Sequence, residues 1–531
     1  MHKAQTFDAI VIGSGMVGGS AARELCKAGL KVLVVEAGPS QPQSQTENGH
    51  PIQKRCYAFS ENTRQYFVND RDNPYFTPPD QPFSWIRARA LGGRSLLWAG
   101  HCYRMTDLEF LAANEDGVGV NWPITSEEIA PYYDKAESIL GVTDRTFFGG
   151  IEGANQLAHD EKHFGEAFAK FGPKLIRARL SRIGSPGDTK TSCLHCGRVA
   201  ANCSRPAASP DTTLAEALKT GRLTIRTQSP VSHITADGNG SPTLVCGVDQ
   251  KTSKEFAVKG RLIFLCASTL ESTRILLNSQ SSRYPEGLAN SSGVLGHYLM
   301  DHVSGIVVTG SFDRPIISRN VDYGAGMFYI PRWQNLGGHR SDRFLRGYGY
   351  EMFVLPAHHE LLPCGGTQSS LLEQAGKASG NAVVSLCAFG EMLPRCDNFV
   401  EIDKEGRKDA YGIPILKIDC KFGDNEREMA KQMVSSAQEM LESAGVKVND
   451  VQGVPSEPGL AIHEAGTCRM GFDPKTSVLN AFNQCHDAPN IFVTDGSCFP
   501  SVGVQNPVLT MVALTIRACE YAVQKLRKDE I

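Results

Sequence analysis

The sequence predicts an α/β fold in which a parallel β-sheet carries a nucleotide-binding turn and is joined to a second domain of sheet and helix. Three observations predict it. Residues 8–38 spell a strand–turn–helix–strand unit, buried strand patterns and a helix recur at residues 221–277, and residues 461–531 return to a strand and a long helix. The chain has 531 residues, more than the ~250–300 at which one core stops growing, so two or more domains are expected.

The first unit has the order that a dinucleotide requires. Residues 9–12 are an apolar run typical of a buried parallel strand, residues 13–18 (GSGMVG) form the tight turn, and residues 21–27 continue as a helix. A second apolar strand covers residues 31–35. Because both strands, the turn and the helix are present together, the unit favours a bound dinucleotide over a glycine-rich turn without a ligand.

Each glycine of this turn has a separate physical role in a dinucleotide site. Gly13 permits the turn, Gly15 lets backbone N–H groups approach a pyrophosphate, and Gly18 allows the helix to pack closely on the strand. Glu36 follows the second strand, where its carboxylate can accept from both ribose hydroxyls and would repel a 2′-phosphate.

Composition and charge exclude several classes of function. The net charge is −3 and no basic run is present, so nothing indicates a nucleic acid or an anionic membrane as partner. The longest apolar windows, such as residues 507–516, are far shorter than the ~20 residues that span a bilayer.

The N-terminus and the cysteines indicate a cellular compartment. The first strand begins so near Met1 that no room remains for a signal peptide. Of the 16 cysteines, most are scattered through apolar segments and fit reduced, buried thiols. We therefore expect a cytoplasmic protein; the alternative is export on a partner subunit that carries the signal.

The elements after Glu36 no longer repeat a simple strand–helix unit. Residues 40–85 are polar and predict a long excursion over the surface. Residues 85–100 form a glycine-punctuated loop of basic and aromatic side chains that would suit a flat, negatively charged cofactor. A capped helix is expected from Ser126, and the strands of residues 221–267 lead into a helix at residues 270–277.

The middle of the chain predicts a separate layer without a cofactor motif. Alternating strand patterns occupy residues 305–310, 382–389 and 415–420, and an amphipathic helix covers residues 426–445. No internal repeat or low-complexity segment is visible.

Four separated motifs resemble those of the glucose–methanol–choline (GMC) oxidoreductase family, in the family's order. They are the nucleotide unit, Gly92-Gly93-Arg-Ser95, His463-x-x-Gly-Thr-x-Arg-Met-Gly471, and Asp495-Gly-Ser followed by Asn506-Pro507-x-x-Thr510. The resemblance implies an α/β FAD-binding domain (Rossmann-like, GMC type) and a discontinuous α+β substrate domain that carries an antiparallel sheet above the flavin.

The resemblance also implies domain boundaries and cofactor contacts. We expect the FAD-binding domain at residues 1–150, 215–302 and 455–531, with the surface excursion at 40–85, and the substrate domain at residues 151–214 and 303–454. The residues expected to contact FAD are Gly13, Gly15, Gly18, Glu36, Gly92, Gly93, Ser95, Asp495, Pro507 and Thr510.

The attachment of FAD is expected to be noncovalent. Sugar oxidases of the family that attach FAD covalently carry a histidine immediately before the tryptophan that corresponds to Trp98, and this chain has Leu97 there. His101, just beyond Trp98, is the weaker candidate for a covalent link.

The family's catalytic pair falls on His463 and Asn506. Oxidation of an alcohol requires loss of the O–H proton and transfer of a hydride to flavin N5, so a positioned base whose pKa is near neutrality helps, and His463 is that candidate. Asn506 would hold the substrate oxygen; its alternative role is to cap the helix that starts at Pro507. His302 lies in a Leu-Met-Asp-His motif that is usually structural in the family.

The start of that last helix carries a further expectation. Its positive end, placed under the flavin pyrimidine as in relatives, would stabilise the anionic reduced flavin.

One cysteine cluster leaves two interpretations open. Cys193, Cys196 and Cys203, with His195 nearby, resemble cysteine clusters that hold iron–sulfur centres in some cytochrome-linked relatives. A loop with reduced cysteines and no metal is the expected state.

The motifs most resemble the sugar-oxidising branch, which contains pyranose oxidases and glucoside 3-dehydrogenases. This implies oxidation of a ring secondary hydroxyl of a sugar or glycoside, at C2 or C3, to a keto sugar. The alternatives are a polyol, other alcohol or sterol oxidoreductase, or a flavin-containing lyase. Oxygen or another oxidant would accept the electrons, and a partner subunit or a homo-oligomer is possible.

Overall fold

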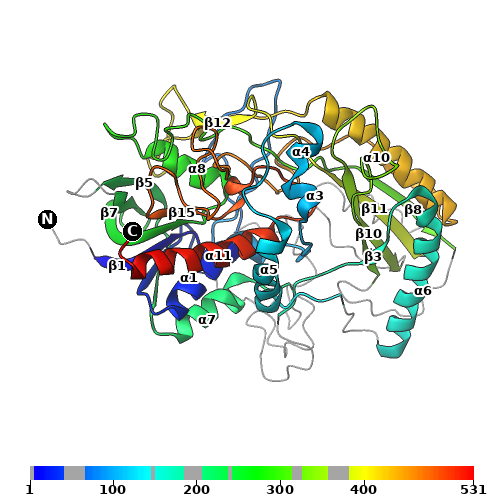
Figure 1. Ribbon diagram of the computed structural model, residues 1–531, viewed down its shortest axis with the longest axis horizontal. Coiled ribbons are helices and arrows are strands. Elements are labelled where there is room, and N and C mark those ends of the chain that lie inside the picture. The colour runs from blue at the N-terminus through cyan, green and yellow to red at the C-terminus, as the bar shows by residue number, and fades with distance from the viewer. Residues whose placement is uncertain are drawn as a thin grey trace.

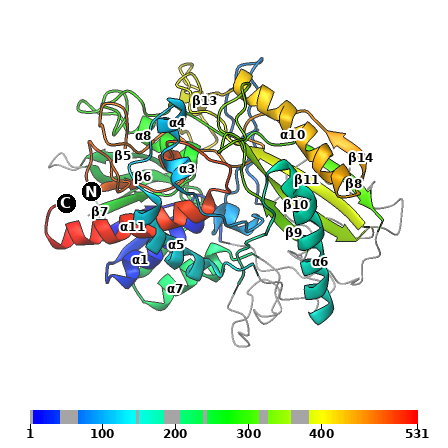
Figure 2. The ribbon, with the colours of Figure 1, turned by 45° about the vertical axis from the view of Figure 1, so that its right-hand side comes forward.

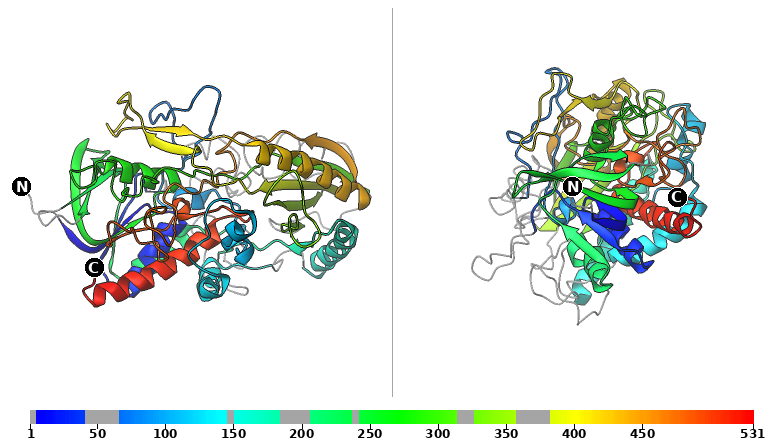
Figure 3. Two further views of the ribbon diagram at one scale, coloured as in Figure 1. Left: turned by 45° about the horizontal axis from the view of Figure 1, so that its top comes forward. Right: turned by 90° about the vertical axis from the view of Figure 1, so that its left-hand side faces the viewer.

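The computed structural model describes residues 5–40, 66–144, 150–183, 206–236, 242–313, 326–356 and 382–531. Two β-sheets occupy opposite ends of an elongated molecule, and both chain termini lie at the end that contains the parallel strands (Figures 1 and 3). The polypeptide crosses between the two sheets several times, so segments that are distant in sequence meet where the sheets face each other.

The first sheet has seven strands in the order β4-β2-β1-β7-β6-β5, with β15 paired to β7. Its strands are β1 (Thr6–Ile12), β2 (Val32–Val35), β4 (Leu223–Arg226), β5 (Val231–Ala236), β6 (Pro242–Asp249), β7 (Lys254–Leu265) and β15 (Ile491–Val493). Strands β4, β2, β1, β7 and β15 are parallel, whereas β5 and β6 add antiparallel pairings at the other edge. A nucleotide bound at the carboxyl ends of the parallel strands is typical of such a sheet.

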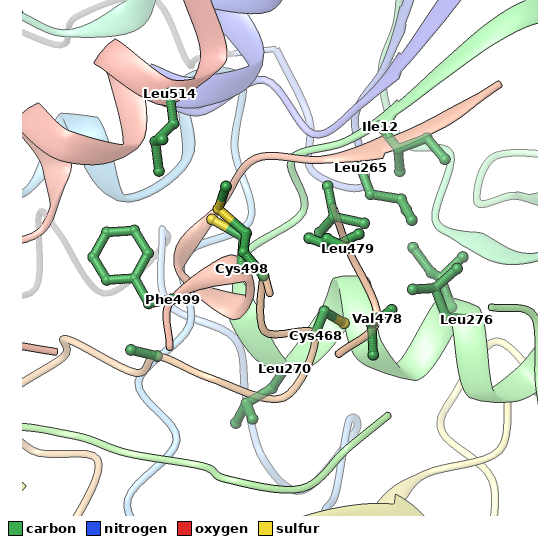
Figure 4. Close-up of a cluster of buried hydrophobic side chains, with 14 of the residues drawn as sticks. Ile12, Leu265, Leu270, Leu276, Cys468, Val478, Leu479, Cys498, Phe499 and Leu514 are labelled. Carbon is green, nitrogen blue, oxygen red and sulfur yellow. The ribbon is translucent and has the colours of Figure 1, made fainter. Parts of the chain in front are cut away.

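Helices and loops bury both faces of this sheet. Ala9, Val11 and their neighbours on adjacent strands pack under α1 (Met16–Lys27), α7 (Thr213–Lys219) and α11 (Val508–Arg527). The opposite face packs on α8 (Thr269–Asn278) and on the segment that leads into β15. Figure 4 shows this second core, where Ile12 and Leu265 meet Leu276, Leu479 and the buried Cys468 and Cys498.

The second sheet has six strands in the order β14-β8-β11-β10-β9-β3, and the pairings given for it are antiparallel. Its strands are β3 (Ile176–Arg177), β8 (Val307–Phe312), β9 (Met327–Ile330), β10 (Tyr348–Pro356), β11 (Ala382–Gly390) and β14 (Lys447–Gln452). Tyr350 and Met352 point to the face that packs on α6 (Gly150–Phe168) and α10 (Asp424–Ser443), which Figure 2 shows against the sheet. Because side chains alternate along a strand, Gly349, Glu351 and Phe353 lie on the other face.

Shorter elements connect the two sheets. They are η2 (Gly93–Leu96), α3 (Asp107–Phe110), α4 (Ala112–Asp116), α5 (Ser126–Leu140), η3 (Ala169–Phe171), η5 (Ser209–Asp211), η6 (Gly496–Cys498) and the hairpin of β12 (Phe399–Ile402) and β13 (Leu416–Asp419). The capped helix expected from Ser126 is α5, and its cap is a capping box in which Thr125 and Glu128 each accept from the other's backbone N–H.

The predicted fold class is confirmed: a mixed sheet of the Rossmann type stands beside a separate antiparallel sheet. The strands expected within residues 305–310, 382–389 and 415–420 are β8, β11 and β13, and the predicted amphipathic helix is α10. The second half of the predicted surface excursion returns to the interior, because Phe83 and Trp85 join the core. In the described part of the chain, no helix is long and apolar enough to cross a membrane.

Candidate active site

The glycines of the first turn have different neighbours. A Cβ at Gly13, whose φ is +98°, would lie 2.4 Å from the Cys266 carbonyl oxygen, and one at Gly18 would lie 2.0 Å from the Gly13 oxygen. These two glycines are therefore required for the packing of β1, β7 and α1. A Cβ at Gly15 would meet nothing closer than the Gly92 oxygen at 4.0 Å. The space beside Gly15 is open, and the N-terminus of α1 makes no side-chain cap there.

Glu36 lies buried at the end of β2, as predicted. Its Oε2 accepts from the Ser14 backbone N–H at 3.0 Å and from the Ser14 hydroxyl at 2.5 Å, and its Oε1 accepts from the Gly38 N–H at 2.7 Å. Burial raises the pKa of this carboxyl, and these hydrogen bonds act in the opposite direction. The hydrogen bonds fix the carboxylate beside the glycine turn, with further lone pairs available to a ligand hydroxyl.

The Gly92–Ser95 loop lies against the glycine turn. The Gly92 N–H donates to the Ser14 hydroxyl at 2.9 Å, and Gly93 lies so close that a Cβ there would be 3.5 Å from the Gly15 Cα. The Ser95 hydroxyl donates to the Gly92 oxygen and accepts from the Ser209 N–H, so it is already paired within the protein. Gly15, Gly92 and Gly93 thus form one surface built of backbone, suited to a close ligand approach.

The arginines of this loop are paired with protein carboxylates. Arg89 donates to Glu271 at 2.9 Å, and Arg94 donates to Glu464 at 2.7 Å. Arg87 forms an ion pair with Asp70. In the described residues, protein carboxylates thus pair with these basic side chains, and the Arg94 side chain remains 31% exposed.

His463 lies between the two sheets and is partly exposed. Its ring packs near Phe389 of β11, with ring centroids 5.8 Å apart, and meets His302 edge-on at 4.9 Å. His302 is buried and interacts with two groups: its Nδ1 lies 2.8 Å from His463 Nδ1, and its Nε2 lies 2.9 Å from the Gly503 carbonyl oxygen. His302 therefore joins the His463 loop to the segment that carries Asn506.

The protons on these two rings follow from their partners. A carbonyl only accepts, so His302 Nε2 carries a proton and donates it to Gly503. Burial lowers the pKa of His302 to about 4, so the ring is neutral and its Nδ1 accepts from His463 Nδ1–H. A neutral His463 then has its lone pair on Nε2, as a base requires. Burial, with the nearby His302, Arg94 and His101, holds the pKa of His463 well below its ordinary value rather than near neutrality.

Asp301 holds the backbone of the His463 loop. Its Oδ2 accepts from the Gly459 N–H at 2.7 Å and the Ala461 N–H at 3.2 Å, and its Oδ1 accepts from the His463 N–H at 3.0 Å. Burial, followed by the nearby Glu464, raises the pKa of Asp301 to about 7. Ile462 beside His463 adopts a φ of +62°, a strained conformation for a β-branched residue that the surrounding contacts maintain.

Asn506 is half-buried at the start of α11. Its Nδ2 donates to Glu351 Oε1 on β10 at 3.1 Å, and the N-cap of α11 is Pro507, with no side-chain cap bond. The capping role considered for Asn506 is therefore not observed. The amide retains its Oδ1 and a second N–H for a ligand.

Glu351 and His101 extend this polar cluster. His101 is buried, its Nδ1 lies 3.0 Å from the Tyr103 hydroxyl, and its Nε2 lies 3.5 Å from Glu351 Oε2. Tyr103 in turn stacks on Tyr329 of β9 with centroids 3.8 Å apart. The inner face of the antiparallel sheet, with Tyr103 stacked on it, thus brings a carboxylate and two phenols to the residues that the sequence predicts as catalytic.

The remaining predicted residues have protein partners. Asp495 accepts from the Ser272 hydroxyl and from the N–H and hydroxyl of Ser497, so it ties β15 to α8 and η6. The Thr510 hydroxyl lies 2.8 Å from the Tyr133 hydroxyl of α5. Pro507 is buried at the helix start. Cys193, Cys196 and Cys203 lie outside the described residues, and the described residues contain no cluster of metal-ligand type.

Sequence reasoning missed Glu351, Tyr329 and Asp301. A signal for Glu351 was present: it interrupts an otherwise uncharged strand, Tyr348–Pro356, and charged residues are rarely buried without a partner or a task. Tyr329 carried no comparable signal, since aromatic residues are common in strands.

The residues present fit FAD. The backbone at Gly15 has open space where a Cβ would lie, and the helix start there attracts a pyrophosphate. Glu464 Oε1 is buried and has no hydrogen-bond partner in the described part of the chain, so a ligand donor would satisfy it. Glu36 would hold the ribose hydroxyls.

Comparisons with known proteins agree with this site. Residues 394–515 match the family described as GMC oxidoreductase, and residues 8–123 match the family described as FAD dependent oxidoreductase. The chain is 29% identical to a 2-methyl-1,2-propanediol dehydrogenase of Mycolicibacterium austroafricanum, over 97% of this chain and 94% of that protein.

Two further relatives are named for other substrates. The chain is 26% identical to the fructose dehydrogenase large subunit of Gluconobacter japonicus, over 98% of each chain. It is also 26% identical to a paromamine 6'-oxidase of Streptomyces fradiae, over 97% of this chain and 91% of that protein.

Proposed function

Because the chain is an FAD-dependent GMC oxidoreductase that acts on CH–OH groups, we propose that it oxidises a ring secondary hydroxyl of a sugar or glycoside, at pyranose C2 or C3, to a keto sugar. The observation that carries the proposal is the position of His463, whose Nε2 is unprotonated, beneath a sheet face that offers polar groups at Glu351 and Tyr329. A polyhydroxylated ring has donors and acceptors both for His463 and for the polar groups of the sheet face.

The residues divide the chemistry as follows. His463 Nε2 takes the hydroxyl proton of the substrate, while His302 holds the ring in the required tautomer through Nδ1. Asn506 fixes the substrate oxygen with the part of its amide that Glu351 does not engage. Bound FAD supplies the hydride acceptor. Phe389 and the inner face of the sheet limit the approach of water to His463.

Regiochemistry is proposed to follow from position. Secondary hydroxyls of one ring differ little in reactivity, so the product depends on which oxygen reaches both His463 and Asn506. The inner face of β10 and β11 orients the ring, since Glu351 and Phe389 belong to these neighbouring strands. We therefore expect one dominant keto sugar.

A small 1,2-diol is the second candidate substrate. The relative named 2-methyl-1,2-propanediol dehydrogenase matches nearly the full length of this chain at 29% identity, which favours this class over a sterol or a lyase substrate.

The test is anaerobic reduction of the enzyme-bound flavin by a panel of sugars, aryl glycosides, 1,2-diols and primary alcohols, followed by mixing with air. Bleaching by sugars or glycosides, with a single keto product in the NMR spectrum, is the expected result. Bleaching only by small diols would replace the sugar by the second candidate, and cyanohydrin cleavage without bleaching would indicate a lyase. Rapid return of the yellow colour in air identifies oxygen as the electron acceptor; slow return indicates another acceptor or a partner subunit.

A further inference from the structure

Glu351 is a buried carboxylate without a cationic partner at the centre of the proposed site. It is 3% exposed, it lies on the inner face of β10, and its two oxygens face the Asn506 amide at 3.1 Å and His101 Nε2 at 3.5 Å. No lysine or arginine forms an ion pair with it in the part of the chain that the structure describes. A buried carboxylate costs free energy unless it is well hydrogen-bonded, so the remaining lone pairs of Glu351 need hydrogen-bond donors.

Two neighbouring polar groups are also unsatisfied. The Tyr329 hydroxyl and His101 Nε2 are buried and have no hydrogen bond within the described residues. Tyr329 pairs with Glu351 across strands β9 and β10, so both side chains occupy the same face of the sheet. Unsatisfied buried groups of this kind are rare in proteins, and their occurrence around one carboxylate marks a ligand position.

Gly349 lies on the same face, two residues from Glu351. A Cβ there would lie 2.7 Å from the Ile330 carbonyl oxygen and 3.3 Å from the Tyr329 hydroxyl, so the β10 backbone lies close to these groups. Its partner on β11 is Phe389, which contacts His463. Neighbouring positions of β10 and β11 therefore link the candidate base to the unsatisfied groups.

We propose that Glu351 determines substrate specificity by accepting a hydrogen bond from a second donor on the substrate, a hydroxyl or an ammonium group on the carbon next to the oxidised carbinol. The two groups must be adjacent because Asn506, which holds the reacting oxygen, is itself in contact with Glu351. The hydrogen-bond partners of two groups in contact lie close to each other, and the two heteroatoms of a vicinal pair, about 3–4 Å apart, meet this requirement. The Tyr329 hydroxyl makes the second contact.

The proposal rests on the role of His463 and Asn506 given under the proposed function, and it does not depend on a sugar ring. Vicinal diols, sugars and amino sugars share the required pair of groups, whereas monohydric alcohols lack it. A hydrogen bond to a charged group contributes enough for a discrimination of about 10- to 100-fold.

The experiment compares Glu351→Gln with the matched surface variant Glu442→Gln, whose carboxylate is exposed on α10. Substrates come in sets that differ by the second group: propan-2-ol, propane-1,2-diol and 1-aminopropan-2-ol, and a methyl glucoside with its 2-deoxy and 3-deoxy analogues. The limiting rate of flavin reduction and the apparent Kd are measured separately. Binding is also measured by calorimetry, which gives a Kd for compounds that the enzyme does not oxidise.

Wild type and Glu442→Gln are expected to prefer the compounds with two adjacent groups. Glu351→Gln is expected to reduce this preference about 10- to 100-fold, mainly through Kd, while the monohydric alcohol changes less than about threefold. The glutamine oxygen can still accept from Asn506, so Asn506 should keep its position in this variant. If the reduction rate instead falls equally for every substrate, Glu351 acts only by positioning Asn506, and that result overturns the proposal.

A second variant covers the case in which Glu351→Gln does not fold. Tyr329→Phe removes only a hydroxyl without a hydrogen bond and is expected to weaken binding of the two-group compounds about 3- to 10-fold. An unchanged preference in either folded variant overturns the proposal. If propane-1,2-diol reduces the flavin and no sugar does, the proposed sugar substrate is wrong. The role of Glu351 is then still decided by comparing propane-1,2-diol with propan-2-ol.

Discussion

At the scale of single residues, the candidate base leads to the most direct prediction. His463→Ala removes the proton acceptor while the backbone hydrogen bond from residue 463 to Asp301 is kept. Flavin reduction should slow by the ~10²–10⁴-fold typical of general-base loss, and FAD should stay bound. Stopped-flow reduction and the visible spectrum of the purified variant measure both. Near-normal reduction would exclude His463 as the base.

The pair of histidines predicts a pH dependence. A base accepts a proton only when it is unprotonated, so the rate of flavin reduction falls as the pH drops through the pKa of the base. Since the pKa of His463 is held low, the reduction rate of the wild type should be flat from pH 8 to well below 6.5. His302→Gln keeps an acceptor for His463 Nδ1–H, and the neutral ring that it replaces carries no charge between pH 5 and 8, so the profile should stay flat. An acid limb that moves to higher pH would show that His302 is charged beside His463.

The control for this prediction is His159→Gln, an exposed histidine on α6. Reduction rates between pH 5 and 8 are compared for the three proteins.

At the scale of elements, the glycine turn predicts two different failures. Gly15→Ala adds a methyl group to open space, at a backbone φ of −60° that alanine accepts, so the chain should fold but bind FAD weakly. Gly18→Ala drives a Cβ to 2.0 Å from the Gly13 oxygen, so it should destabilise the apoprotein itself by several kcal/mol. Thermal unfolding of each apoprotein and FAD titration distinguish the two; equal unfolding temperatures would contradict the assignment.

The conformation of the loop that carries His463 depends on Asp301, just as that of the turn depends on its glycines. In Asp301→Asn, an amide NH₂ replaces one carboxylate oxygen and faces a backbone N–H, so a hydrogen bond of the loop is lost. We expect a loss of about 1–3 kcal/mol in stability and a lower reduction rate. Chemical denaturation measures the first quantity; an unchanged stability would mean that the loop is held by other contacts.

Sequence alone predicted the elements whose signals are local. The turn at Gly13–Gly18, the capped helix from Ser126 and the apolar periods of β1 and α10 each depend on a few neighbouring residues, and the structure has them. It also placed Glu36 at the end of β2. The contacts across the two sheets were not predictable in this way, because Asn506 meets Glu351 over a separation of 155 residues. The contact between the Thr510 and Tyr133 hydroxyls was not predictable either, since residue type alone does not reveal which neighbour a folded chain brings close.

At the scale of the whole molecule, the predicted cofactor contacts lie on segments separated by hundreds of residues, from Gly13 to Thr510. The glycine turn and the Gly92 loop are joined directly by the hydrogen bond from the Gly92 N–H to the Ser14 hydroxyl. A ligand that also bridges them should stabilise the native state by an amount that grows with the logarithm of its concentration, about 2.7 kcal/mol at a hundredfold excess over Kd. Removal of FAD should lower the unfolding temperature, and added FAD should restore it.

This restoration requires that the cofactor be released intact, which depends on its attachment. Leu97 stands where covalently flavinylated relatives carry histidine, and His101 is 2% exposed, with its ring nitrogens directed to Tyr103 and Glu351. Position 97 has no imidazole and that of His101 is buried, so acid precipitation should release the yellow colour into the supernatant. Colour retained in the pellet, with a mass increase of one FAD on a peptide, would reverse this prediction and would make the unfolding temperature independent of added FAD.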